Sequence, residues 1–131
     1  MKKQLKHVEN FHNSFGVKNN LNPTSDIDQD TFNLRYRLMN EENDEYLEAC
    51  KNQDIIEIAD SLGDMMYILC GTILSHGLQN IIEEVFEEIQ MSNMSKLDEK
   101  GLPIYRKDGK IMKGPNYFKP NIKKILSHYI D

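Results

Sequence analysis

The sequence predicts an all-α fold: a bundle of four to five helices followed by a small C-terminal β-hairpin arm. Apolar residues recur at helical spacing through most of the first 91 residues, and glycine and N-cap residues divide this pattern into separate helices. After about residue 100 the pattern changes to short alternating runs around an Asp-Gly dipeptide, which is typical of a hairpin turn. The length of 131 residues fits one domain, which we expect to span residues 1–131.

The first 75 residues predict three helices. A short amphipathic helix covers residues 2–15 and ends at Gly16. A third, long helix runs from Ile55 to about Ser75 with Asp54 as its N-cap, and His76-Gly77 closes it. Only the polar stretch 49–53 separates it from the second helix, so we expect a helix, a tight turn and a helix. The residues that could cap the second helix are Asp26, Asp28 and Asp30.

The remaining residues predict smaller elements. A fourth helix runs roughly over residues 78–91, with glutamates on one side that we interpret as a solvated face. A β-hairpin over residues 102–113 turns at Asp108-Gly109, and a short final helix covers residues 121–129.

Charge is distributed unevenly, although the net charge is only −5. Residues 26–64 contain 12 acids and 3 bases, whereas residues 96–124 contain 9 bases and 3 acids. A nucleic-acid-binding domain is positive overall, so we expect no nucleic-acid partner. The longest apolar run, residues 65–74, is too short for a membrane span, and the basic N-terminus lacks the apolar core of a secretory signal. We therefore expect a cytoplasmic protein without a membrane partner.

Six carboxylates stand at helical spacing on the second and third helices. Hard cations such as Mg²⁺ and Mn²⁺ prefer oxygen ligands of this kind, and the predicted tight turn brings the two helices together. The other interpretation is structural: Glu57 could complete a capping box with Asp54, and the aspartates could simply face water. The candidate metal ligands are Glu41, Glu42, Glu45, Glu57 and Asp60, with Asp64 as an additional one.

Histidine spacing argues against a dinuclear iron site. Such bundles use two Glu-x-x-His pairs, and here only Glu9 and His12 have that spacing. A site made of carboxylates alone instead favours Mg²⁺ or Mn²⁺, and therefore phosphate chemistry.

The two acidic motifs, Glu41-Glu42-Asn43-Asp44-Glu45 and Glu57-Ile58-Ala59-Asp60, resemble the EExxE and ExxD signature of the all-α nucleoside triphosphate pyrophosphohydrolases. This superfamily includes MazG-like enzymes, dimeric dUTPases and phosphoribosyl-ATP pyrophosphohydrolases. The segments 93–96, 108–110 and 113–117 are similar to a MazG-like branch. The aspartate that directly precedes the apolar run in many relatives is here Asp64, whose partner three residues back is Ser61.

The resemblance implies hydrolysis of an NTP or dNTP, with dUTP among the candidates, to the monophosphate and pyrophosphate. It also implies Mg²⁺ or Mn²⁺ as cofactor and a homodimer or dimer of dimers. By position, Glu42 and Glu45 are the catalytic candidates within the metal-ligand set, and Glu42 would orient the attacking water. The candidate substrate-binding residues, each with an ordinary solvated side chain as the alternative, are Asn93, Lys96, Arg106, Lys113 and Tyr117.

A second hypothesis remains open at this point. The same fold could serve as a non-catalytic helical module that binds a nucleotide or a partner. The complete acidic set favours the enzyme, because a degenerate member would be expected to lose at least one ligand. The sequence does not specify the base or the sugar of the substrate.

Overall fold

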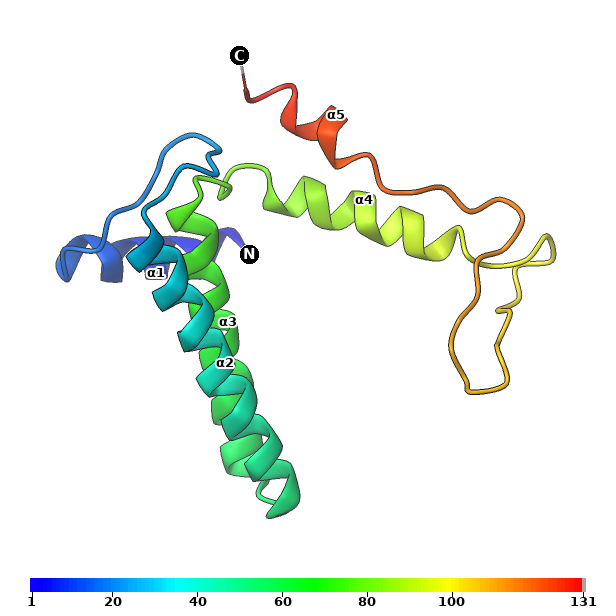
Figure 1. The fold of residues 1–131 in the computed structure, drawn as a ribbon, viewed down its shortest axis with the longest axis horizontal. Helices are drawn as coiled ribbons and strands as arrows, with labels where there is room; N and C mark the ends of the chain where they lie inside the picture. The colour runs from blue at the N-terminus through cyan, green and yellow to red at the C-terminus, as the bar shows by residue number, and fades with distance from the viewer. Residues whose placement is uncertain (131) are drawn as a thin grey trace. The chain divides into compact units, whose positions relative to one another are not determined.

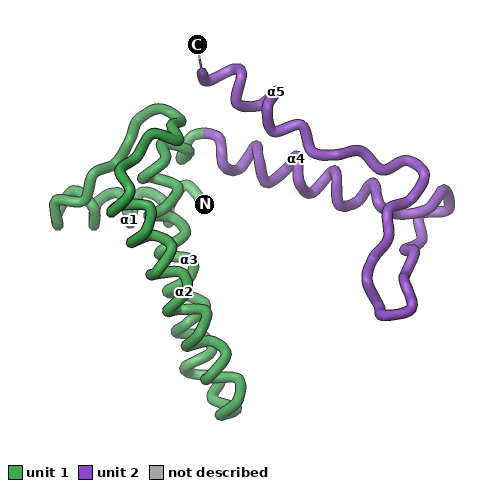
Figure 2. Tube along the Cα trace, in the orientation of Figure 1, with its two compact units in different colours: residues 1–80 green, residues 81–131 purple. Residues whose placement is uncertain are grey.

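Helices form the regular structure of residues 1–130, which the computed structural model describes (Figure 1). No strand occurs in this part of the chain, so the prediction of an all-α fold is confirmed. The chain divides into two compact units, residues 1–80 and residues 81–131 (Figure 2). One domain over residues 1–131 stays a prediction. The helices are α1 (Lys2–Ser14), α2 (Gln29–Lys51), α3 (Ile55–Ser75), α4 (Ile82–Met94) and α5 (Ile122–Leu126).

An antiparallel hairpin of α2 and α3 is the main feature of the first unit. Asp28 caps α2, since its carboxylate accepts a hydrogen bond from the Thr31 backbone N–H. Asp54 caps α3 by accepting from the backbone N–H groups of Ile56 and Glu57, as predicted. Between the helices, Gln53 adopts a positive φ of 53°, which reverses the chain within the turn.

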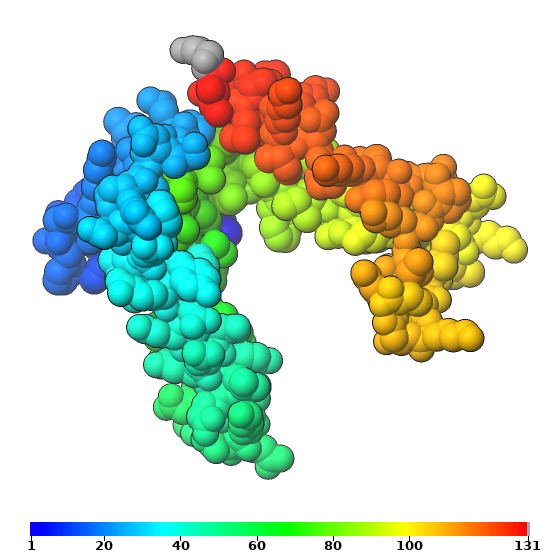
Figure 3. All heavy atoms as spheres, in the orientation of Figure 1, coloured from blue at the N-terminus to red at the C-terminus, as the bar shows by residue number. Residues whose placement is uncertain are grey.

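Helix α1 packs on α3 near the open end of this hairpin. Leu5 and Val8 of α1 are buried, and the Phe11 ring meets the Tyr67 ring edge-on at 5.6 Å. The distal part of the hairpin extends beyond α1 as a narrow rod, and no other segment of the first unit covers the face shown in Figure 3. This rod therefore leaves much of its apolar surface exposed, including Leu62 and Met66.

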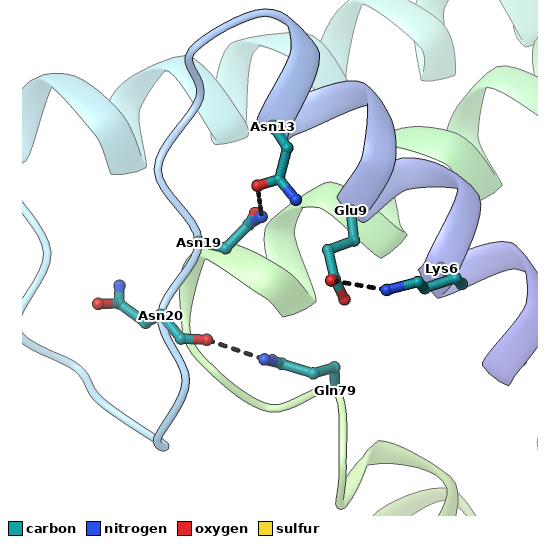
Figure 4. A network of polar contacts seen from close by, with 6 residues as sticks. All are labelled: Lys6, Glu9, Asn13, Asn19, Asn20 and Gln79. Carbon is teal, nitrogen blue, oxygen red and sulfur yellow. Dashed lines mark hydrogen bonds and ion pairs between the residues drawn. The ribbon is translucent and has the colours of Figure 1, made fainter.

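The loop between α1 and α2 is tied to the C-terminal end of α3. The backbone N–H groups of Asn20 and Thr24 donate to the carbonyls of Leu74 and His76, and the Gln79 amide donates to the Asn20 carbonyl at 2.8 Å (Figure 4). The first two bonds satisfy carbonyls at the C-terminal end of α3, which a helix leaves free, and the third holds the loop in place.

A Schellman motif ends α3 and explains why α4 starts four residues later than predicted. The backbone N–H of Gly77, at φ +68°, donates to the Leu74 carbonyl, and that of Leu78 donates to the Ile73 carbonyl. Leu78 is thus part of the cap of α3, and helical structure resumes only at Ile82.

In the second unit, the C-terminal segment runs back along α4. Ser92 donates to the Phe118 carbonyl at 2.8 Å, and the Asn121 backbone N–H donates to the Glu88 carboxylate at 2.8 Å. Farther on, the Tyr129 hydroxyl donates to the Glu84 carboxylate at 3.3 Å. Two of the glutamates assigned to a solvated face therefore hold this segment in place.

The predicted β-hairpin arm over residues 102–113 is wrong. The turn at Asp108-Gly109 forms, but only one isolated antiparallel bridge, between Tyr105 and Ile111, follows from it. Both bridge residues are exposed, at 64% and 53%, so no buried face stabilises longer strands. Turn formation is a local property, whereas strands require packing that this segment does not have.

Helix α3 is long and apolar enough to cross a membrane when judged by length and composition alone. The core helix of a water-soluble protein meets the same test, and α3 packs against both α1 and α2. It also carries Glu57, Asp60 and Asp64 in its first half. The helix is therefore weak evidence for a membrane span.

Replacing Gly77 by alanine should lower the free energy of unfolding by more than about 2 kcal/mol. A Cβ there would lie 2.0 Å from the Asn22 carbonyl oxygen, in a backbone conformation that disfavours side chains. Gly63→Ala is the matched control within α3, because its Cβ meets nothing within 4 Å, and it should stabilise by about 0.5–1 kcal/mol. Urea unfolding of both variants checks this, and equal midpoints would contradict the assignment of the cap.

Candidate functional site

The register of α2 against α3 decides which carboxylates face one another. A Cβ at Gly71 of α3 would lie 2.7 Å from Nη1 of Arg35 on α2, so these two positions are opposite each other. Seven residues make about two helical turns, and in an antiparallel pair Glu42 and Asp64 each lie seven residues from this contact toward the turn. Glu42 and Asp64 therefore face each other across the line of contact between α2 and α3. We call this line, from the level of Arg35 and Gly71 to that of Glu42 and Asp64, the seam.

The electrostatics of Glu42 agree with this placement. Burial is the largest cause that raises its pKa, to about 7, followed by the hydrogen bond and charge of Glu45 and then by the charges of Asp64 and Asp60. One of its carboxylate oxygens, Oε2, is buried and has no hydrogen-bond partner within residues 1–130. We call Glu42, Glu45, Asp60 and Asp64 the acid cluster.

Two of the predicted ligands lie beside the acid cluster and not in it. Glu41 is exposed and is turned about 100° around α2 from Glu42. Glu57 is exposed in the first turn of α3. It does not complete a capping box, because the Asp54 backbone N–H donates to the Ala49 carbonyl. Its carboxylate is therefore not used in the cap, and its role as a ligand stays a prediction.

The acid cluster has the donor chemistry for a hard cation but is not closed around one. Within residues 1–130, no three His, Cys, Asp or Glu side chains converge closely enough to hold a metal ion. The orphaned Oε2 of Glu42 nevertheless faces a set of carboxylates whose mutual repulsion a divalent cation would relieve. The carboxylates present supply the oxygen donors that Mg²⁺ or Mn²⁺ prefers, but a site built on them would require exposed side chains such as Asp60 to rotate inward.

A groove runs alongside the acid cluster on the same two helices. Its volume is about 450 Å³, and Asn43 and Met65, which line it, directly follow Glu42 and Asp64 in the chain. The sequence analysis did not identify this groove, because no spacing rule shows which faces of two packed helices remain uncovered. The remaining lining residues are Tyr36, Met39, Asn40 and Leu69.

All five predicted substrate-binding residues lie in the second unit, and three of them gather where segment 114–118 packs on the end of α4. The Phe118 backbone N–H donates to Ser95 Oγ at 3.2 Å, and a Cβ at Gly114 would lie 2.7 Å from the Lys96 carbonyl oxygen. The Lys113 ammonium lies 4.8 Å from the centre of the Tyr117 ring, within cation–π range. Lys96, Lys113 and Tyr117 therefore belong to one local structure.

The other two predicted substrate-binding residues lie outside this packed structure. Asn93 is exposed in the last turn of α4, although its carbonyl accepts from the Lys96 backbone N–H at 3.2 Å. The guanidinium of Arg106 is paired with the Asp108 carboxylate, which raises the pKa of Arg106 and lowers that of Asp108. Arg106 would have to leave this exposed ion pair to reach a phosphate. Substrate binding by all five residues stays a prediction.

Comparison with known families agrees with the acidic motifs. The family model described as phosphoribosyl-ATP pyrophosphohydrolase matches residues 8–93, more than half of the chain. The matched range contains α2, α3 and the whole acid cluster. It confirms the resemblance that the two acidic motifs indicate. A search of curated proteins finds no match.

Metal-free protein should lose stability as the pH rises from about 4.5 to above 7. A raised pKa means that the folded state holds the Glu42 proton more tightly than the unfolded state, whose value is near 4.5. Stability is therefore greatest below 4.5 for this group and falls as the pH passes through 7. Urea unfolding in EDTA at pH 5 and pH 8 measures the effect. Glu42→Gln should remove this part of the pH dependence, and the exposed-site control Glu41→Gln should keep it; identical slopes in both variants would contradict the assignment.

Proposed function

Because the chain belongs to the phosphoribosyl-ATP pyrophosphohydrolase family, we propose that it hydrolyses a nucleoside triphosphate to the monophosphate and pyrophosphate. The observation that carries the proposal is the position of Glu42, with a buried and unpartnered carboxylate oxygen, opposite the aspartates of α3. Paired carboxylates on facing helices suit a Mg²⁺- or Mn²⁺-dependent reaction of a polyanionic substrate. The substrate is an NTP or dNTP, with dUTP among the candidates.

The acid cluster would hold the cation through Glu42, Glu45, Asp60 and Asp64. When bound, the cation would neutralise phosphate charge and activate water for attack. The Oε2 atom of Glu42 accepts no hydrogen bond from the described residues, so it is available to orient the water that attacks the α-phosphorus. The neighbouring Glu45, which helps to raise the pKa of Glu42, would fix the direction of that carboxylate.

The second unit would contribute the positive charge. Lys96 and Lys113 would neutralise phosphate oxygens, and Arg106 would join them after releasing Asp108. Asn93 and Tyr117 would contact the base or the sugar. Their shared local structure at the end of α4 supports a common role for Lys96, Lys113 and Tyr117.

The proposal includes a homodimer, or a dimer of such dimers, in the cytoplasm. Large apolar side chains on α2 and α3 are exposed beside the groove, among them Leu69 at 44% and Leu47 at 53%. Exposed apolar surface of this extent on two neighbouring helices is typical of a protein–protein contact. A second copy of the same hairpin would bury it.

A screen of all NTPs and dNTPs with Mg²⁺ and Mn²⁺, with pyrophosphate as the measured product, tests the activity. Phosphoribosyl-ATP belongs in the same screen, because the family is described by that substrate. Pyrophosphate as the first product supports the proposal, whereas orthophosphate would mean cleavage of a different bond. Absence of turnover at saturating metal would favour the non-catalytic binding module.

Alanine at Glu42 or Glu45 should reduce turnover by at least roughly 100-fold, the loss typical of removing a group that acts in the transition state. Glu48→Ala is the matched control, because it removes an exposed glutamate from the same helix. Circular dichroism should show unchanged helicity in all three variants. Undiminished pyrophosphate release from the Glu42 variant would reject its catalytic role.

Asp64→Asn should impair turnover more than Glu57→Gln. Both residues lie on α3, but the charge of Asp64 acts directly on Glu42, whereas Glu57 lies about two turns nearer the helix start. We expect a loss of roughly 100-fold for Asp64→Asn and less than about tenfold for Glu57→Gln. Metal titrations of kcat measure the difference, and the reverse order would make Glu57 the principal ligand of α3.

A further inference from the structure

Arg35 is a partly buried cation whose partners are incomplete. Its Nη1 donates to His12 Nε2 at 3.4 Å, and its Nε is buried without a hydrogen-bond partner within residues 1–130. The ion pairs of this part of the chain do not include it. Burial of the guanidinium lowers its pKa. A charge removed from water in this way is costly unless an anion compensates it.

His12 does not supply the missing negative charge. The ring is only 3% exposed, and its Nδ1 donates to Asn19 Oδ1 at 2.6 Å. The Asn19 amide nitrogen in turn donates to Asn13 Oδ1 at 3.3 Å (Figure 4). A guanidinium can only donate hydrogen bonds, so His12 Nε2 is the acceptor toward Arg35 and brings no negative charge.

Arg35 lies on the same seam as the acid cluster. It precedes Glu42 by seven residues, which places it on the same face of α2 at a distance of about 10 Å along the helix. Gly71 leaves the space that the guanidinium occupies, because a Cβ there would lie 2.7 Å from Nη1. The seam thus carries a cation about two turns from a set of carboxylates.

We infer that Arg35 binds a β- or γ-phosphate oxygen of the nucleotide whose α-phosphate is held at the acid cluster. This inference rests on the proposed function and adds a phosphate-binding residue that the acidic motifs do not contain. The guanidinium lies level with Gly71, about two turns from Asp64, a separation of the order that a triphosphate and its bound cation cover. Arg35 as a whole is only half-buried, so its outer guanidinium N–H groups can donate to phosphate in a charge-assisted geometry, whereas Nε itself is buried. A carboxylate from a second copy is the other anion that could fill this position.

Calorimetric binding of inorganic tripolyphosphate in the presence of Mg²⁺ tests the inference without any turnover. Arg35→Met should weaken binding roughly tenfold, the scale of one charge-assisted hydrogen bond, and Arg35→Lys should restore part of the loss. Arg37→Met is the matched control, since it removes the same charge from an exposed position two residues away on α2. Equal dissociation constants for wild type and Arg35→Met would overturn the inference.

Steady-state kinetics with the best nucleotide separates this role from a structural one. Arg35→Met should raise KM roughly tenfold and change kcat by less than about twofold, whereas Arg37→Met should change neither. The wild type could hydrolyse a nucleotide while Arg35→Lys and Arg35→Met have the same KM. That result would reject Arg35 as a phosphate ligand but leave the proposed function intact. Wild type without turnover would reject the proposed function itself. A change of oligomeric state in Arg35→Met, with unchanged tripolyphosphate binding, would assign the missing anion to a second copy and overturn the inference.

Discussion

The antiparallel register of α2 against α3 is the constraint on which the rest of the first unit depends. A three-residue connection joins the helices, and the contact of Arg35 with Gly71 fixes their relative position about five turns away. Between these two points the register sets Glu42 against Asp64. Like charges facing one another destabilise the pair, so this register persists because the caps, the turn and the apolar contacts outweigh the repulsion.

Local features of the sequence were sufficient for the helices but not for the site. Asp54 and the start of α3 were predicted correctly because capping involves only neighbouring residues. Glu57, Asp60 and Asp64 share one arc of α3, and helical spacing alone could not rank them as ligands. Only the register of the opposite helix shows that Asp64 acts more strongly than Asp60 on Glu42. The hairpin arm failed for the same reason: its turn is local, whereas strands need a packed face that spacing does not reveal.

Exposed apolar surface and the acid cluster lie on the same two helices, so the proposed subunit association would be coupled to formation of the site. In the proposed homodimer, a second hairpin over the groove would remove water from around Asn43 and Met65, the neighbours of Glu42 and Asp64. Lower exposure to water strengthens the repulsion among the carboxylates, and it also strengthens their attraction to a cation. Association would therefore strengthen metal binding at the acid cluster, and it would also bury the exposed apolar side chains beside it.

The seam contains two electrostatic defects of opposite sign: carboxylates that repel one another, and a guanidinium without an anion. Each costs stability in the free protein, and sequences commonly break local packing rules of this kind where they bind a ligand. A metal ion alone would relieve the first defect and leave the second, whereas a free phosphate would do the reverse. In the proposed complex, a nucleoside triphosphate bound together with its cation would present both charges at once, the cation to the carboxylates and a phosphate to Arg35. The distribution of charge along α2 thus favours such a complex over either component alone.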